Sequence, residues 1–309
     1  MAGVRQNHPK GRPLSTKHLK LSPYLLLVLT TLFWSGNFVL ARYVRLEVPP
    51  VGLSFWRWAL AGLLLLPFVW RDMVRFRGLV REHLGLVISL SLLGVTGFNT
   101  LVYLGLQTTT ASNGVLLQSV MPLIIILLSR FVLGTRMSPW QVTGILASLV
   151  GVLIIVTKGE FSLLLALEVA HGDIWILAAV TIWGLYSVLL RKLPPELAGL
   201  PLLGYTVLIG VLGIAPLYLW EIGTGAVVQL NGVTLVTVVY VAIFPSLLAF
   251  LFWNRAVRQV GPNRAGQFIH LIPVFGSVLS VLLLGERLHM YHLAGISFVA
   301  LGIYTGTLL

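Results

Sequence analysis

The chain has 309 residues, of which 57% are apolar and only 10% charged, and its mean hydropathy is +0.95. A soluble domain carries about a quarter charged residues, so this composition excludes a water-soluble protein and predicts an all-α integral membrane protein. The absence of cysteine excludes disulfides and thiolate metal sites, and the net charge of +12 lies in short loops between apolar runs, which argues against a nucleic-acid partner.

Residues 1–22 are expected to form a basic cytoplasmic tail, because the apolar run that follows is full length and has no clear small-residue cleavage site. Ten transmembrane helices are then predicted, each of about 20 mostly apolar residues. Their expected ranges are 23–42, 52–70, 84–106, 114–133, 140–157, 173–190, 202–220, 233–253, 265–284 and 291–308.

The basic residues orient these spans. Most of the 21 Lys and Arg residues fall in the tail and in the loops after the second, fourth, sixth and eighth spans. The loops on the other side hold only Arg42, Arg45, Lys158 and Arg287. Because positively charged loops stay in the cytoplasm, both termini are predicted to face the cytoplasm of a bacterial cell, with the protein in the inner membrane.

The two halves of the chain repeat. At a shift of 151 residues, Pro122 falls on Pro273, Gly134 on Gly285, Arg136 on Arg287, Gly144 on Gly295 and Gly151 on Gly302. The sequence therefore predicts two five-helix repeats, residues 23–157 and 173–309, joined by a periplasmic linker at 158–172. Since five is odd, the second repeat enters the membrane from the opposite side, and such inverted repeats are typical of secondary transporters. The proline pair is expected to bend the fourth and ninth helices.

Several segments resemble a known family. FWSGNFVLARYV, PPVGLSFWRWALAGLLLLP, TTASNGVLLQSVMP, VGPNRAGQFIHLIP and LGERLHMYHLAGISFVALGIY are similar to motifs of EamA-type members of the drug/metabolite transporter superfamily. The resemblance covers roughly residues 23–308. It implies ten helices in two inverted repeats and the export or exchange of small metabolites, often amino acids. The first repeat has Thr135 where the family commonly has Glu, whereas Glu286 is present in the second.

Polar and aromatic residues inside the spans form the predicted substrate site. At 1.5 Å per residue, Trp34 and Trp183 each lie about 15 Å into their spans, near the bilayer midplane. Polar groups at that depth face protein or water rather than lipid. The residues expected to line a central cavity are Trp34, Asn37, Asn99, Tyr103, Gln118, Trp183, Tyr186, Tyr240, Trp253, Gln267 and His270. The alternative for each is a structural role, as interhelical hydrogen-bonding group or interface anchor.

Two ionisable residues within spans have alternative roles. Arg57 is the only basic residue well inside a span. Its long side chain is expected either to snorkel to the outer surface or to contact a substrate carboxylate. His270 is either a proton carrier or a hydrogen-bonded structural residue. Because no Asp or Glu lies deep in any span, a dedicated multidrug-cation antiporter is disfavoured.

The sequence thus predicts a secondary transporter that exports small organic metabolites, above all amino acids, including aromatic or bulky apolar ones. It is expected to act without cofactor or metal, as a monomer or weak dimer, with protons as a candidate coupling ion. The alternative is an importer or exchanger of another metabolite, such as a nucleoside or sugar derivative. A membrane-embedded enzyme ranks third, because the chain lacks a Gly-x-Ser-x-Gly elbow and a Walker A sequence, and His289 and His292 have only Glu286 as a neighbouring carboxylate.

Overall fold

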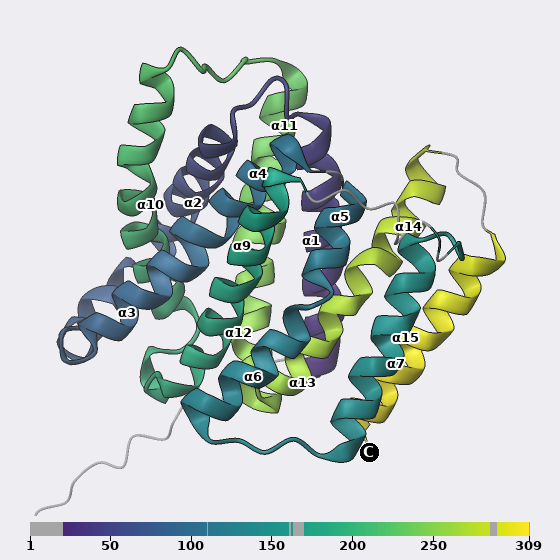
Figure 1. Ribbon diagram of the computed structural model, residues 1–309. Coiled ribbons are helices and arrows are strands. Elements are labelled where there is room, and N and C mark those ends of the chain that lie inside the picture. The colour runs from purple at the N-terminus through teal and green to yellow at the C-terminus, as the bar shows by residue number, and fades with distance from the viewer. Residues whose placement is uncertain (1–20, 110, 161, 163–169, 285–288, 309) are drawn as a thin grey trace, which may run out of the picture.

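A computed structural model describes residues 21–109, 111–160, 162, 170–284 and 289–308, and Figure 1 shows a bundle of helices. In the first half these are α1 (Pro23–Tyr43), α2 (Pro50–Glu82), α3 (Leu84–Ser91), a π-helical turn (Leu92–Gly97), α4 (Phe98–Thr108), α5 (Ala111–Gln118), α6 (Met121–Leu133) and α7 (Pro139–Val156). In the second half they are α9 (His171–Leu189), two 3₁₀ turns (Leu190–Lys192 and Pro195–Leu197), α10 (Leu200–Gly223), α11 (Gly232–Val241), a π-helical turn (Ala242–Leu248), α12 (Ala249–Val260), α13 (Pro262–Gln267), a 3₁₀ turn (Phe268–His270), α14 (Leu271–Leu284) and α15 (Met290–Leu308).

Eight helical segments in the described part of the chain are long and apolar enough to cross a membrane. They are Pro23–Ala41, Pro50–Glu82, Leu84–Thr108, Asn113–Leu133, Pro139–Val156, His171–Lys192, Leu200–Gly223 and Gly232–Val260. The first eight predicted spans coincide with them; the second extends to Glu82 because its arginine-rich continuation is also helical. The last two predicted spans correspond to α14 and α15, which are helical but are not among these eight.

Some residues singled out in the sequence lie outside the described part of the chain. They are most of the basic tail (1–20), the linker segment 163–169, and Gly285, Glu286 and Arg287.

The paired prolines interrupt the fourth and ninth helices, as predicted. The first interruption falls at Ser119 and Val120, between α5 and α6 and just ahead of Pro122. In the second half, the helix tightens to the 3₁₀ turn Phe268–His270 ahead of Pro273. A proline has no backbone N–H, so each removes the helical donor from the carbonyl four residues earlier and opens the ladder locally.

Two π-helical turns lie at matching places in the halves, and sequence reasoning did not foresee them. Pro245 lies within the turn Ala242–Leu248 and cannot donate to the helical ladder, which favours the wider turn there. In the turn Leu92–Gly97, a methyl group on Gly94 would come within 2.6 Å of the Tyr186 ring. Such turns occur frequently at functional sites.

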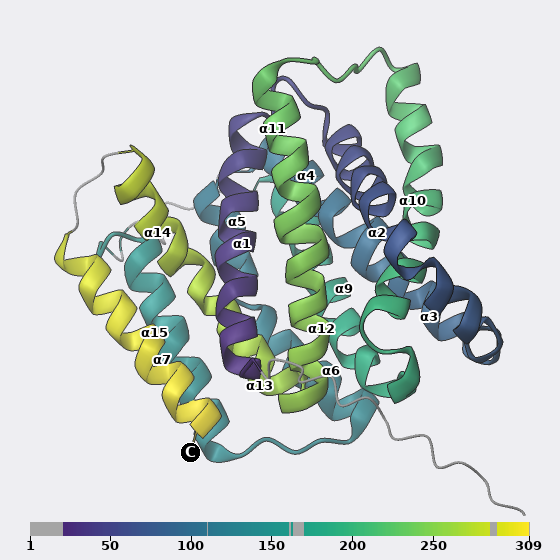
Figure 2. The same cartoon turned by 180° about the vertical axis from the view of Figure 1, so that it is seen from behind.

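Helices α7 and α15 lie side by side (Figures 1 and 2) and pack through glycine. A Cβ on Gly144 would meet the backbone of Gly302, and a Cβ on Gly151 would meet the backbone of Gly295. Residue numbers rise along one helix as they fall along the other, so the pair is antiparallel. Gly144 corresponds to Gly295 and Gly151 to Gly302, yet each contacts the other's counterpart. This reciprocity is what a two-fold relation between the helices requires.

Close glycine packing makes a prediction for Gly302→Ala. The new methyl group would meet the Gly144 carbonyl oxygen and would lie 2.5 Å from the Ser148 backbone nitrogen. Overpacking of this kind lowers the free energy of unfolding by about 1–3 kcal/mol, so the thermal unfolding midpoint in detergent should fall. The control is Gly276→Ala, where no described heavy atom lies within 4 Å of the added methyl. Equal midpoints for the two variants would contradict this packing.

Candidate functional site

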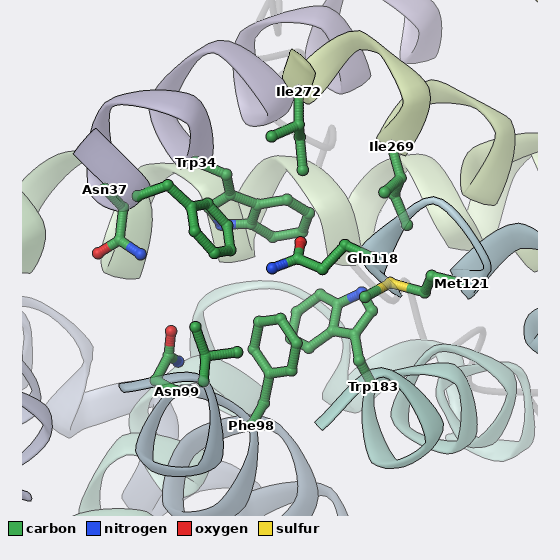
Figure 3. A pocket seen from close by; sticks show the side chains of 11 residues that line it. Trp34, Asn37, Phe98, Asn99, Gln118, Met121, Trp183, Ile269 and Ile272 are labelled. Carbon is green, nitrogen blue, oxygen red and sulfur yellow. The ribbon is translucent and has the colours of Figure 1, made fainter. Parts of the chain in front are cut away.

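A small cavity lies between helices of both halves, and Figure 3 shows the side chains that line it. Most of the polar and aromatic lining residues are almost fully buried: the exposed fraction is 7% for Trp34, 4% for Asn37, 3% each for Asn99 and Gln118, and 0% for Trp183. The lining residues are Trp34, Asn37, Phe38, Phe98, Asn99, Val102, Gln118, Met121, Trp183, Ile269 and Ile272. The structure thus brings together Trp34, Asn37, Asn99, Gln118 and Trp183 of the predicted set.

Two indoles form the aromatic part of the lining. Trp34 of α1 and Trp183 of α9 meet edge to face, with ring centroids 5.0 Å apart and planes at 87°. Phe98 of α4 lies 4.6 Å from Trp183, also centroid to centroid. Aromatic pairs in such geometry contribute about 0.5–1.5 kcal/mol each beyond the area that they bury. The indoles predicted to lie at equal depth are therefore in direct contact.

Tyr186 and Trp253 lie behind this surface rather than on it. Tyr186 stacks on Trp183 at 4.9 Å, and Trp253 lies 5.2 Å from Trp34 and 5.8 Å from Trp183. Their polar atoms are bonded within the protein: the Tyr186 hydroxyl donates to Asn254 Oδ1 at 2.8 Å, and Trp253 Nε1 donates to Ser187 Oγ at 3.2 Å. In this conformation they support the cavity and do not line it.

Arg57 of α2 is fully buried beside the cavity. Its Nε donates to Ser246 Oγ at 2.8 Å, in the second π-helical turn. Its Nη1 donates to Asn37 Oδ1 at 3.1 Å, to Asn99 Oδ1 at 2.8 Å and to the Tyr103 hydroxyl. The prediction that Arg57 snorkels to the outer surface is therefore wrong, because neutral acceptors from three other segments bind its guanidinium inside the bundle.

This buried charge has no counter-charge nearby among the described residues. No Asp or Glu in the described part of the chain lies within ion-pair distance of Arg57, whose other close contacts are the faces of Trp58 and Tyr103, at 5.3 and 5.8 Å. Burying a charge costs free energy unless hydrogen bonds and opposite charge compensate for it. Here hydrogen bonds to neutral groups and the aromatic faces compensate in part.

The remaining predicted residues lie elsewhere. His270 lines a second small cavity, which shares Gln118, Ile269 and Ile272 with the first. The His270 ring lies between the Ser148 hydroxyl, 2.6 Å from Nδ1, and the Ser119 carbonyl, 2.9 Å from Nε2. Tyr240 donates to the Phe33 carbonyl at 3.3 Å, and Gln267 packs against Gly306. Neither Tyr240 nor Gln267 lines either cavity.

Sequence reasoning missed the apolar lining residues and Ser246. Phe98, Met121 and Ile272 carry no signal that separates them from other apolar residues in a membrane helix. For Phe98 the one available indication was its position beside Asn99, and for Ser246 its position beside Pro245 in a span.

Comparison with known proteins identifies the family. The sequence pattern of the EamA-like transporter family matches residues 21–157 and 170–307. This match covers most of the chain, which therefore belongs to that family. The chain is a multi-pass membrane transporter.

Similar proteins agree with this assignment. The chain is 28% identical over 295 residues to the uncharacterized transporter YyaM of Bacillus subtilis (strain 168), covering 94% of each protein. It is 27% identical over 288 residues to an uncharacterized transporter of Archaeoglobus fulgidus, covering 92% of this chain and 96% of the relative. It is 24% identical over 265 residues to the uncharacterized inner membrane transporter YicL of Salmonella typhimurium, covering 84% and 86%. A protein of known crystal structure shares the fold, with a TM-score of 0.75 at 21% identity over 93% of this chain and 96% of the other.

The Arg57 contacts predict a cost for Ser246→Ala. The substitution leaves the Arg57 Nε–H, a buried charged donor, without its acceptor, which costs about 1–3 kcal/mol of unfolding free energy. The control is Ser277→Ala, since the Ser277 hydroxyl donates only within its own helix, to the Pro273 carbonyl at 2.9 Å. The thermal unfolding midpoint in detergent should fall clearly for Ser246→Ala and little for Ser277→Ala; the reverse order would refute the assigned contact.

Proposed function

We propose that this EamA-family transporter exports small organic metabolites across a bacterial inner membrane, and that amino acids with aromatic or bulky apolar side chains are its main substrates. The observation that carries the proposal is the small buried cavity, which is lined by two indoles in edge-to-face contact and by the amides of Asn37, Asn99 and Gln118. Aromatic surfaces hold planar or apolar groups, and a few placed amides orient a polar head. The name of the Salmonella relative and the basic loops support the inner-membrane location.

The architecture that we propose has ten spans in two inverted five-helix repeats, with both termini cytoplasmic and the chain acting as a monomer or weak dimer. Residues 23–157 and 173–309 form the repeats, and 158–172 the periplasmic linker. The family match in two segments, the matched helix interruptions and the reciprocal glycine contacts of α7 and α15 support the inverted relation.

Contacts between corresponding positions suggest how the cavity opens to either side. Trp34 corresponds to Trp183 and Ser119 to His270, and the partners of each pair touch. Positions that touch their own counterparts lie on the two-fold axis. A cavity on that axis is exposed to opposite sides of the membrane when the repeats exchange conformations, which is alternating access.

The second candidate is an importer or exchanger of a nucleoside or sugar derivative, because the same indoles stack on planar bases and sugar faces. A membrane-embedded enzyme ranks third. Counterflow in liposomes separates transport from catalysis, since an enzyme would change the labelled compound chemically.

Transport assays test the substrate class. Liposomes that contain the purified protein are loaded with labelled phenylalanine, tryptophan, leucine and the remaining amino acids. They should release at least one labelled amino acid faster than protein-free liposomes loaded in the same way. Trp34→Ala and Trp183→Ala should each lower that flux roughly tenfold or more, since about 1.4 kcal/mol of lost binding is a factor of ten.

The controls are Trp70→Ala and Trp220→Ala, whose indoles are 58% and 70% exposed and lie outside the cavity. Trp34→Phe and Trp183→Phe keep a ring in the buried site and should retain intermediate flux. Normal flux in both alanine variants would remove these indoles from the site, and no release of any amino acid would remove this substrate class.

We assign any proton coupling to His270. The neutral ring donates from Nε2 to the Ser119 carbonyl and accepts at Nδ1 from the Ser148 hydroxyl. The Ser148 hydroxyl lies 3.0 Å from the Ile145 carbonyl, so it can donate there when a protonated ring donates to it instead. The same three groups therefore satisfy both protonation states.

An imposed pH gradient tests this assignment. It should drive substrate accumulation in wild-type liposomes but not in His270→Gln liposomes, while exchange without a gradient persists in both. His289→Gln, in an exposed residue outside both cavities, serves as control. Gradient-driven accumulation by the His270→Gln protein would exclude the ring as the proton carrier.

A further inference from the structure

The orientation of two amides at one end of the cavity is fixed by their partners. The Asn37 and Asn99 side-chain oxygens both accept from Arg57 Nη1, and Asn37 Oδ1 also accepts from the Tyr103 hydroxyl at 2.7 Å. Because these oxygens are engaged by donors, the NH₂ groups are the ends that remain available. Asn99 Nδ2 has no hydrogen-bond partner in the described part of the chain, although Asn99 is only 3% exposed.

A third amide reaches the same space from another helix. Figure 3 shows the Gln118 side chain among the residues that line the cavity, together with Trp34 and Trp183. Its Nε2 also lacks a partner among the described atoms, and the residue is 3% exposed. A buried donor without an acceptor is unfavourable, so the unpaired donors of Asn99 and Gln118 call for an acceptor supplied from outside the protein.

The nearby charge has the sign that complements such an acceptor. Among the residues that the structure describes, Arg57 has no carboxylate partner and no acidic side chain lines the cavity. In a low-dielectric interior a buried positive charge attracts an anion and repels a second cation at short range. The unpaired amide donors and the positive charge of Arg57 therefore both favour an anionic ligand that accepts hydrogen bonds.

We propose that the cavity recognises an acidic head group: a carboxylate that accepts hydrogen bonds from the amides of Asn99 and Gln118, while the apolar part of the substrate lies against Trp34 and Trp183. The inference rests on the proposed transport of a small metabolite and narrows the substrate class to organic monocarboxylates, amino acids among them. The ammonium group of an amino acid is not required. Arg57 does not line the cavity and is a positioning residue, which turns the amides and supplies the charge.

Three compounds with one ring and different head groups test the proposal: 3-phenylpropionate, phenylalanine and phenethylamine. Their dissociation constants for the purified protein are measured by calorimetry, independently of transport. The two acids should bind within about threefold of each other, and the amine at least about tenfold more weakly, which corresponds to about 1.4 kcal/mol. Equal or tighter binding of phenethylamine, or binding of none of the three, overturns the proposal.

Asn99→Asp gives a matched test within the protein. The substitution keeps the size of the side chain, replaces the unpaired donor by an acceptor and places a carboxylate beside Arg57 Nη1, where an ion pair helps the variant to fold. Binding of 3-phenylpropionate should weaken by about tenfold or more, while that of phenethylamine is unchanged or tighter. Asn231→Asp makes the same change at the start of α11, where Asp also caps a helix, and should leave the ranking unchanged.

The role of Arg57 is tested by the relative affinities for the acid and the amine, and not by the stability of the variants. Arg57→Lys keeps the charge and should keep the preference for the acid, whereas Arg57→Gln should bring acid and amine within about threefold of each other. If the Arg57→Gln variant still prefers the acid over the amine, Arg57 has no part in the inference. If the Asn99→Asp variant still prefers the acid, the whole inference is overturned. The ranking of the wild-type protein decides the proposal even if a variant fails to fold.

Failure of the proposed function is distinguishable from failure of this inference. Tight binding of 3-phenylpropionate without transport of any amino acid supports the acidic-head site and refutes amino-acid export. Transport of phenylalanine together with equal binding of phenethylamine supports amino-acid transport and refutes the acidic-head site.

Discussion

One guanidinium in an apolar bundle constrains the centre of this transporter. Arg57 has to be solvated by protein, because no water-rich surface is within its reach and no carboxylate in the described part of the chain lies beside it. Its acceptors come from α1, α4 and the π-helical turn Ala242–Leu248, so satisfying a single side chain fixes three segments relative to α2. The same bonds set the orientation of the amides in the cavity. Under the proposed binding mode, the packing of these helices and the recognition of the substrate therefore depend on the same hydrogen bonds.

The two halves place different chemistry on a related backbone. Three residues after its Trp, the first half has Asn37, which belongs to the polar cluster, whereas the second half has Tyr186, which stacks on Trp183. The amides of Asn37 and Asn99 thus lie on α1 and α4, whereas Trp183 and the Tyr186 ring stacked behind it lie on α9. A substrate with a polar head and an apolar body can match this arrangement in only one direction. In the mechanism that we propose, the related backbones of the two halves serve the conformational exchange, and the differences between their side chains serve specificity.

Much of this could be predicted from the sequence, for physical reasons. Long apolar runs predict helices, because a backbone inside the membrane must satisfy its hydrogen bonds internally. The paired prolines indicate where the helical hydrogen bonding is interrupted, and the positions of Trp34 and Trp183 indicate a similar depth in the membrane. The burial of Arg57 could not be predicted from the sequence. Whether its side chain reaches the surface or stays buried depends on hydrogen-bond acceptors from other helices, and the sequence around Arg57 does not show which of these lie nearby. Tyr240 and Gln267 illustrate the same limit, because periodicity gives the depth of a polar residue but not the face that tertiary packing selects. Phe98 and Ile272 line the cavity yet are indistinguishable in sequence from residues that face lipid.

The π-helical turn Leu92–Gly97 changes the direction in which the side chains of the following helix point. A wide turn accommodates one extra residue, and at 3.6 residues per turn each extra residue rotates everything beyond it by about 100°. Asn99 and Tyr103 follow this turn directly, so their angular position is set by a phase shift that Leu, Gly, Val and Thr generate. The head-group selectivity that we propose thus depends on the number of residues in a turn that supplies none of the hydrogen-bond acceptors described for Arg57. A one-residue deletion there would re-aim the polar cluster without altering a single member of it.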